Sequence, residues 1–328
     1  TRSIPIIRNY LAKGDEVVLG GDGESILLLK QAFPDLRVID LPSLELRYTS
    51  DPKQSGFYFR AVWALIRFTI ADHYYLRKAL AIEHFDLIIS DNRFGLFSRQ
   101  IRSVYITHQL YPILPKRLRF FQPLARAVHA CIYKRYDEVW VPDYASTDNN
   151  LSGWLSHGRR FDKKVQYIGP LSRFTFPEGI PNLCRSDANY PIVAVLSGLE
   201  PQRTLFEQEL IERFKESTIP VLIVRGKIGS PRSTTRIGAV TMIPYLSDKE
   251  LLPLLLQAEK IIARSGYTSI MDLETLNLLA KAELHPTPGQ SEQEYLAQVL
   301  MHRLSSFSTI CHSEDNSCAT TNNITTSK

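Results

Sequence analysis

Cysteine is scarce in this chain, and the few copies that it has are widely spaced. There are four among 328 residues, none forms a CxxC pair, and their surroundings lack the histidine spacing of a zinc site. The pattern argues against a disulfide framework and against a cysteine-based metal centre. Reduced thiols in a cytoplasmic protein are the simplest account, so we predict a cytoplasmic location. The four residues are Cys131, Cys184, Cys311 and Cys318.

Long apolar runs are missing as well. No stretch reaches the roughly 20 uninterrupted apolar residues of a membrane-spanning helix, because residues 60–71 and 250–258 are interrupted or too short. No signal peptide is visible at the N-terminus. The hydrophobic fraction of 44% is instead that of a globular protein, and the length suffices for two α/β domains.

Neither sign of charge is in large excess. The formal net charge of +5 is modest, so it does not by itself indicate nucleic-acid binding, and we expect no nucleic-acid partner. The charge is compatible with anionic partners such as sugar diphosphates or acidic lipid headgroups, and equally with ordinary surface charge.

Short apolar runs that end in polar or turn residues recur along the N-terminal half, with amphipathic helical stretches between them. Continuous apolar strands separated by helices indicate a parallel, doubly wound α/β sheet. The runs lie at residues 16–23, 36–42, 85–91, 103–108 and 138–143.

The pattern restarts after residues 166–191, which are rich in proline, glycine and polar residues and fit an interdomain connection. We expect two Rossmann-like domains, residues 1–175 and 176–304, facing each other across a cleft. Ligands of open α/β sheets bind beyond the carboxyl ends of the strands. Residues 305–328, rich in Ser, Thr and Asn, are expected to form a loosely ordered tail. The runs of the second half lie at 191–198, 221–226, 239–246 and 260–266.

Residues 260–300 contain the most specific motifs: a strand, Arg-Ser-Gly, a helix with an early acidic residue, and a loop with glutamines. In this the chain resembles the two-domain glycosyltransferases called GT-B. It is most similar to the family of the bacterial enzyme that adds N-acetylglucosamine to lipid-linked muramyl peptide, and its ISDNRFG and ITHQL motifs resemble those of one bacterial branch. The resemblance covers most of residues 1–300. It implies transfer of a hexose or N-acetylhexosamine from a nucleotide-diphosphate sugar, with UDP preferred, to a hydroxyl acceptor.

The start of the chain at Thr1 resembles the helix that comes directly after the family's N-terminal Gly-rich turn, whose histidine is a base candidate in many relatives. That match would place the first strand and its turn upstream. A parallel sheet without one central strand exposes apolar surface and an unpaired edge. We therefore expect the natural protein to begin earlier.

Glycosyl transfer needs a stabilised diphosphate leaving group. The sequence contains no Asp-x-Asp, the usual metal-bridging motif, so we predict no metal ligands and no cofactor. Backbone amides at a helix N-terminus are then the groups left to stabilise the diphosphate. Ser265 and Gly266 lie where a strand turns into a helix. Gly266 permits close backbone approach, and Thr268 and Ser269 can bond phosphate or simply cap the helix. Arg264 can add charge or pair with a surface carboxylate.

Asp272 follows Thr268 by four residues and therefore shares its helix face. The resemblance implies that it binds the ribose diol, where the family usually has Glu; the alternative is an acid that complements the helix dipole. Gln290, Gln293 and Glu294 correspond to a loop whose glutamine pair contacts the donor sugar. The pair is Gln293-Glu294 in this chain, and an exposed helix start with a capping box is the alternative.

Two further segments complete the predicted donor site. Ser197 and Gly198 occupy the position of the family's phosphate-facing loop, although the usual run of glycines is missing. Arg203 can contact phosphate or cap the solvent face of a helix. Tyr245 and Leu246 match the stretch that sandwiches the base, with ordinary packing as an equally weighted alternative for Tyr245.

Two loops of the N-terminal half follow strands and should face the cleft. Asp91 and His108 are candidates for the base that deprotonates the acceptor hydroxyl. A structural role for His108, tying two loops together, is slightly favoured. Asn92, Arg93 and Gln109 are candidates for orienting the acceptor or holding their loops.

Residues 113–135 combine Phe120 and Phe121 with basic residues that include Lys116, Arg117, Arg119 and Arg126. A basic, aromatic helix can dock on an anionic membrane, which would suit a lipid-linked acceptor and peripheral contact with the inner face of the plasma membrane. We expect instead that the aromatic side chains pack inward.

Two rival functions share this fold. A sugar-nucleotide hydrolase or epimerase would turn over the donor without an acceptor. A non-catalytic sugar-nucleotide-binding subunit of a transferase would bind the donor and show no turnover.

Overall fold

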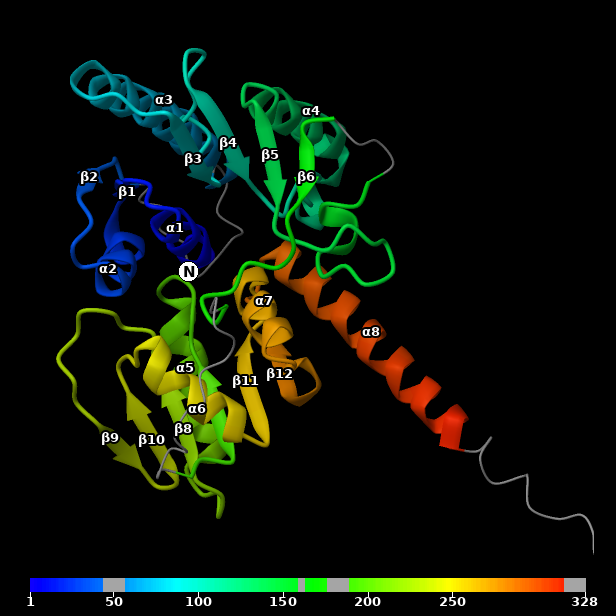
Figure 1. Cartoon of the computed structure of the whole chain (residues 1–328). Helices are drawn as coiled ribbons and strands as arrows, with labels where there is room; N and C mark the ends of the chain where they lie inside the picture. Colours follow the sequence, from blue (N-terminus) through cyan, green and yellow to red (C-terminus); the bar gives the residue numbers. More distant parts are fainter. Residues whose placement is uncertain (44–56, 159–162, 176–188, 316–328) are drawn as a thin grey trace, which may run out of the picture.

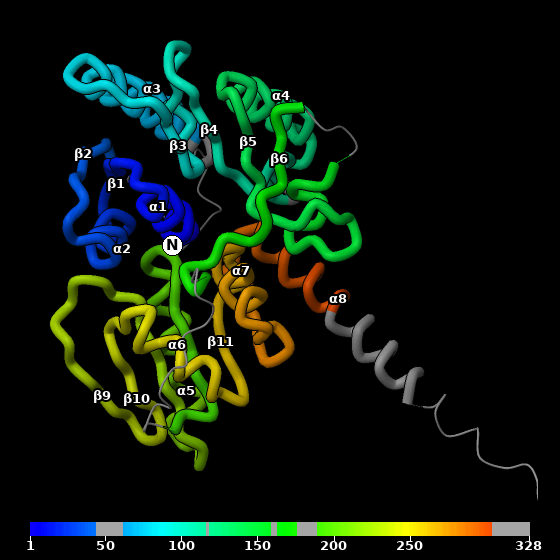
Figure 2. The backbone as a smooth tube through the Cα atoms, viewed as in Figure 1, coloured from blue at the N-terminus to red at the C-terminus, as the bar shows by residue number. Residues whose placement is uncertain are grey.

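The computed structural model describes residues 1–43, 57–158, 163–175 and 189–315. It is an α/β protein with parallel sheets in each half of the chain, and the N-terminus lies between the two halves (Figure 1). Figure 2 traces the backbone from the N-terminal domain through residues 163–175 into the C-terminal domain.

The N-terminal domain contains a four-stranded parallel sheet and a separate two-stranded parallel sheet. Five of the six strands lie at predicted apolar runs, whereas the strand at residues 165–167 was not predicted and overlaps the segment interpreted as an interdomain connection. The larger sheet pairs β3 (Leu87–Asp91), β4 (Arg102–Ile106), β5 (Glu138–Val141) and β6 (Val165–Tyr167) in that order, and the smaller pairs β1 (Leu19–Gly21) with β2 (Val38–Asp40). The helices are α1 (Ser3–Ala12), α2 (Gly23–Ala32), α3 (Phe57–Ile82) and α4 (Gln122–Tyr133), with short 3-10 turns η1 (Lys116–Phe121) and η2 (Gly153–Leu155).

A hollow of about 480 Å³ separates the two N-terminal sheets. Val18 and Leu19 line one side, Leu87 and Ile89 the other, and Ile7 of α1 also borders it. Within the described residues, the edges of β1 and β3 that face this hollow pair with no other strand. A parallel strand placed there would satisfy both edges and join the two sheets.

The hollow makes the expected upstream strand testable. We predict that an N-terminal extension with a short continuous apolar segment before Thr1 raises the Tm by about 5 °C or more, because ~1 kcal/mol moves the Tm of a domain of this size by ~2–4 °C. Differential scanning calorimetry measures this change. A Gly/Ser extension of the same length is the control and should leave the Tm unchanged; equal Tm values for both extensions would contradict the prediction.

The C-terminal domain has one six-stranded sheet of order β12-β11-β7-β8-β10-β9, in which only β9 runs antiparallel to its neighbour. The strands are β7 (Ile192–Val195), β8 (Val221–Val224), β9 (Thr235–Ile237), β10 (Val240–Ile243), β11 (Lys260–Arg264) and β12 (Ala282–His285). The helices are α5 (Gln202–Phe214), α6 (Asp248–Gln257), α7 (Tyr267–Thr275) and α8 (Ser291–Asp315), with a 3-10 turn η3 (Leu279–Lys281). The pattern did not predict β9, which is exposed throughout, or β12, which is half-buried.

The central strands of this sheet are buried on both faces, which explains their continuous apolar runs. Val193 and Ile261 belong to the core on one side of the sheet, and Ala194 and Ile262 belong to the core on the other. Successive side chains of a strand point to opposite faces, so helices on both sides are required.

Helix α8 continues to Asp315, whereas the sequence predicted a loosely ordered segment from residue 305. Extending a helix that has already formed costs much less than starting one, which explains why weak local periodicity did not end it. The rest of the predicted tail, residues 316–328, lies outside the described residues. The expected domain boundary at 175/176 falls at the edge of residues 176–188, which also lie outside them. Cys184 and Cys318 also lie outside them, whereas Cys131 is exposed and free.

The expectation for Phe120 and Phe121 was wrong: both side chains are exposed, Phe120 by 89%. The inward side of α4 is occupied by Gln122, which bonds the backbone of Leu114, and by His129, which packs on the aromatic core. These residues leave no inward position for the two phenylalanines. None of the helices in the described part of the chain is long and apolar enough to cross a membrane.

Candidate functional site

Three helix N-termini meet where the two domains touch. Arg2 precedes α1, Tyr267 begins α7, and Glu292 lies in the first turn of α8. All three contact His108, which follows β4. The first turn of a helix presents unpaired amides and a positive partial charge, so their convergence favours an anionic ligand at this junction.

Asp91, at the end of β3, is held by the start of α1. Its carboxylate accepts hydrogen bonds from Arg2 Nε at 2.6 Å and from Ser3 Oγ at 2.9 Å. Burial alone would raise the pKa of Asp91, but the charge of Arg2 and these hydrogen bonds outweigh it, and the pKa lies below its usual value. The carboxylate thus stays ionised, and in this arrangement it is a weak base.

His108 joins the two domains. Its Nδ1 lies 3.0 Å from Arg2 Nη1, and its Nε2 lies 2.6 Å from the Glu292 carboxylate. Because a guanidinium group only donates hydrogen bonds, Nδ1 must be the acceptor. Nε2 therefore carries the proton and donates a hydrogen bond to the Glu292 carboxylate. The ring also stacks on Tyr267, with centroids 4.1 Å apart. Both nitrogens are therefore engaged, and acting as a base would require His108 to release one partner.

The pKa directions agree with a neutral imidazole beside a carboxylate. Burial lowers the pKa of His108 below its ordinary value, although the bond to Glu292 acts in the opposite direction. Burial would raise the pKa of Glu292, but the hydrogen bond from His108 acts in the opposite direction, and the pKa lies below its usual value.

Of the other three acceptor-side candidates, Arg93 and Asn92 hold the N-terminal domain together. Arg93 donates to Asp72 at 2.6 Å and to Asp22 at 2.8 Å, so it ties β3 to α3 and to the start of α2. Asn92 adopts a φ of 56° and accepts a bond from the Tyr105 hydroxyl. Gln109 is half-buried and lies next to His108, and its backbone amide donates to Thr107 Oγ1. Gln109 is the one of the three placed directly at the junction.

On the donor side, the N-terminus of α7 is open. Gly266 is the N-cap residue, and a Cβ built on it would meet nothing within 4 Å. Thr268 and Ser269 are half-exposed, and within the described part of the chain no hydrogen-bond acceptor is recorded for their amides. Helix N-termini of this kind bind phosphate groups.

Two of the predicted phosphate ligands also brace the loop. Arg264 donates to the carbonyls of Pro286 and Gln202 and lies 3.9 Å above the Phe206 ring, and no carboxylate of the described residues pairs with it. Ser265 Oγ donates to the carbonyl of Gln293. Arg264 therefore supports the strand end from beneath the turn.

Asp272 lies one turn into α7 and is buried. It accepts hydrogen bonds from Ser172 Oγ at 2.7 Å and from Arg173 Nε at 3.1 Å. Burial raises the pKa of Asp272, and Arg173 and Ser172 offset part of that effect. Arg173 also lies 3.3 Å from Asp248, so it links two carboxylates. A ribose diol would have to replace Arg173 or Ser172 at this carboxylate.

Sequence reasoning missed Ser172 and Arg173, which lie in a segment interpreted as an interdomain connection. No short-range signal marks them, since their partners are about a hundred residues away. It also missed Arg2, whose partner Asp91 lies 89 residues away in the same domain, and Glu292, whose partner His108 lies across the domain junction.

The glutamine loop is closed on itself. Gln293 accepts from the Thr287 amide at 2.9 Å and donates to Gln290 Oε1 at 2.7 Å. Glu294 points to solvent, whereas Glu292 faces the other domain. Contacts from these amides to a donor sugar remain a prediction.

The remaining donor candidates lie along the same face of the C-terminal domain. Ser197 and Gly198 are exposed in the loop after β7. Arg203 donates to the carbonyl of Gly226 and pairs with Glu24 of α2, across the domain junction. These residues place the loop after β7 beside the N-terminal domain.

Tyr245 lines a hollow of about 360 Å³ together with Ser247, Arg232 and Gln31 of α2. Burial raises the pKa of Tyr245. Leu246 beside it packs against the core. The hollow thus lies between the predicted base-binding stretch and α2 of the N-terminal domain.

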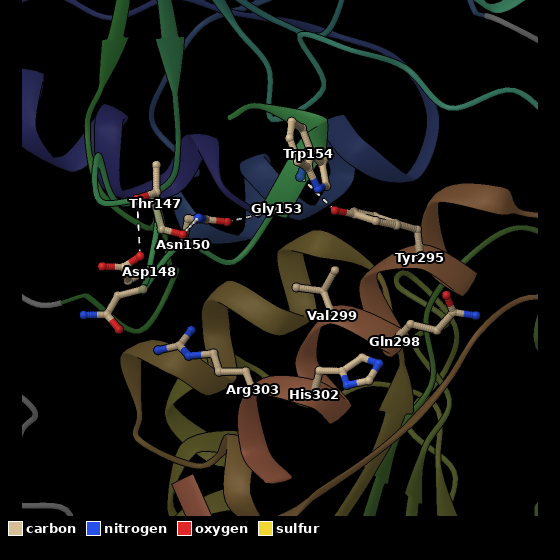
Figure 3. A pocket seen from close by; sticks show the side chains of 11 residues that line it. Thr147, Asp148, Asn150, Gly153, Trp154, Tyr295, Gln298, Val299, His302 and Arg303 are labelled. Carbon is tan, nitrogen blue, oxygen red and sulfur yellow. Dashed lines mark hydrogen bonds between the residues drawn. The ribbon is translucent and has the colours of Figure 1, made fainter. Parts of the chain in front are cut away.

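A third hollow, of about 640 Å³, lies between the loop after β5 and α8 (Figure 3). Trp154 and Asp148 come from the loop, and Tyr295 and Arg303 from the helix. The Tyr295 hydroxyl accepts the backbone amide of Trp154 at 2.7 Å, which fastens α8 to the N-terminal domain. None of the predicted site residues lines this hollow.

His108 gives the junction a pH dependence. Because its pKa is lowered in the folded protein, the unfolded chain binds more protons as the pH falls below ~6.5, and the free energy of unfolding decreases. We predict that the loss of Tm between pH ~7.5 and ~5.5 is smaller in His108→Gln than in the wild type, measured by thermal denaturation.

The matched control is His84→Gln, which removes an exposed histidine away from the junction and should keep the wild-type pH dependence. Equal loss of Tm in His108→Gln and wild type would contradict the assignment of a neutral, buried imidazole.

Comparison with known proteins gives a match at the level of structure only. No protein-family model and no curated protein sequence matches the chain. The glycosyltransferase of kitacinnamycin matches with a TM-score of 0.55 and 15% identity, covering 93% of this chain and 89% of that one. CalG4, the calicheamicin glycosyltransferase, matches with a TM-score of 0.53 and 11% identity over 98% and 96%.

A plant structure matches to a similar degree. Arabidopsis thaliana UGT89C1 complexed with UDP-L-rhamnose has a TM-score of 0.52 and 12% identity, over 92% of this chain and 78% of that one. The chain therefore has the predicted GT-B fold, with two Rossmann-like domains. The narrower likeness to the family that acts on lipid-linked muramyl peptide stays a prediction.

Proposed function

We propose that this protein is a glycosyltransferase that moves a hexose or N-acetylhexosamine from a UDP-sugar to a hydroxyl acceptor. The open N-terminus of α7, at the junction of two Rossmann-like domains, is the observation that carries the proposal. Fold-level likeness to glycosyltransferases supports it by analogy, and UGT89C1 with its bound UDP-L-rhamnose supports the choice of nucleotide.

The donor would lie along the face of the C-terminal domain. Its diphosphate accepts bonds from the amides of Thr268 and Ser269, and its base enters the hollow beside Tyr245. Its ribose reaches Asp272 by replacing the hydrogen bond from Arg173. The guanidinium group of Arg173 is then released to donate to the diphosphate. Arg173 is thus a positioning residue with an anion-binding role.

In the reaction, the acceptor oxygen forms a bond to the anomeric carbon while the bond from that carbon to the diphosphate breaks. The acceptor proton passes to a base, and UDP leaves with the bonding electrons. The amides at the helix N-terminus stabilise the charge that develops on the leaving group. His108 can take the proton only after its Nδ1 loses the bond to Arg2.

Gly266 allows a direct test of this geometry. A Cβ there meets no protein atom within 4 Å, so Gly266→Val should fold, with the Tm lowered by no more than about 4 °C for the less favourable N-cap, and its methyl groups would project into the space proposed for the diphosphate. Losing one charge-assisted hydrogen bond of roughly 1.5–3 kcal/mol weakens UDP binding about tenfold or more. Isothermal titration calorimetry with UDP measures the affinity.

Thr218→Val, at an exposed position before β8, is the matched control and should keep wild-type affinity. Unchanged UDP affinity in Gly266→Val would remove the α7 terminus from the site. Donor consumption in the absence of any acceptor would favour the hydrolase or epimerase, and UDP binding without turnover in the presence of acceptors would favour the non-catalytic subunit.

Holding the diphosphate by amides makes metal unnecessary. We predict that excess EDTA changes the affinity for UDP by less than about twofold, because backbone amides supply the neutralising groups. Calorimetric titrations with EDTA and with added Mg²⁺ measure this. A tenfold gain of affinity with Mg²⁺ would contradict the prediction.

A further inference from the structure

Helix α3 carries an apolar stripe on its outward side. Trp63, Ile66, Ile70 and Tyr74 recur every three or four residues, so they lie on one face of the helix. All four are exposed, Trp63 by 57% and Ile70 by 65%. The opposite side of the helix carries the buried Asp72, which pairs with Arg93 inside the domain.

Helix α4 and the turn before it carry a second stripe. Phe121, Leu124 and Val128 follow the same spacing and are all more than half exposed, and Phe120 beside them is exposed by 89%. Both stripes belong to the N-terminal domain, and α3 and α4 lie at the end of the molecule farthest from the C-terminal domain in Figure 1. We refer to these two stripes together as the outer face.

The charge of the outer face has one sign. Residues 116–135 contain no Asp or Glu, and residues 57–82 contain only Asp72, which is buried. Basic side chains are exposed along both helices. They are Arg67, Arg77, Lys78, Arg119, Arg126, Lys134 and Arg135.

An anionic bilayer fits this combination. Aromatic and aliphatic side chains gain by leaving water for the boundary between headgroups and acyl chains, while flanking Lys and Arg are attracted to acidic headgroups. A second copy of this chain fits poorly, because two outer faces would bring like charges together. Neither helix is long and apolar enough to span, so the contact would be peripheral.

We propose that the outer face docks this protein on the surface of an anionic phospholipid bilayer. In this docked arrangement the candidate site does not face the bilayer, because its residues lie between the two domains and the outer face lies at the far end of the N-terminal domain. The proposal does not depend on the reaction catalysed.

Co-sedimentation with vesicles tests it. The full chain should bind vesicles of roughly one part phosphatidylglycerol to two parts phosphatidylcholine, bind pure phosphatidylcholine far less, and lose binding at high salt. The double variant Ile70→Gln/Leu124→Gln changes only exposed side chains, so its Tm should stay near that of the wild type, while its partitioning falls about tenfold or more.

Leu205→Gln on α5, a leucine of the C-terminal domain that is exposed by 49%, is the control and should bind vesicles as the wild type does. No binding to the anionic vesicles would overturn the proposal. Light scattering that shows a dimer broken by the double variant, without vesicle binding, would overturn it in favour of a second copy.

Discussion

The parallel direction of the strands is the constraint on which this molecule depends. A parallel strand must be followed by a crossover, so the strands of each sheet deliver their carboxyl ends, and the helices that follow them, to one edge. Asp91 and His108 follow β3 and β4, and Gly266 follows β11. Since these edges face each other, residues that are far apart in the chain come together at the domain junction.

Burial at that junction requires each charge to have a partner. Arg2 pairs with Asp91, His108 with Glu292, and Arg173 with Asp272. An unpaired buried charge is costly, so a ligand that enters must replace these partners one for one. The backbone amides at the start of α7 differ from these charged groups, because a ligand can accept their hydrogen bonds without displacing a protein partner.

The two sides of the N-terminal domain have contrasting chemistry. Its inner edge, at the junction, is polar and internally bonded, whereas the outer face combines exposed apolar stripes with basic residues. A lipid-linked acceptor, left open by the sequence, would bring both sides into one function, since such an acceptor resides at the surface that the outer face is proposed to contact.

Local pattern in the sequence determined the α/β class, the two-domain plan and the positions of most parallel strands, because doubly buried strands such as β8 must be apolar along their whole length. It also identified Gly266 at a strand-to-helix turn, since a main-chain feature needs only local residue types. It missed the exposed strand β9, which has no buried face to impose a pattern.

The tertiary structure alone decided which side chains are free. Nothing local to His108 or Asp272 indicates that Glu292 and Arg173 occupy them, because each pair spans about a hundred residues or more. The exposure of Phe120 was likewise decided by packing, since Gln122 and His129 already fill the inward side of α4. Residue types depend on the sequence, but their partners depend on how the chain closes over long distances.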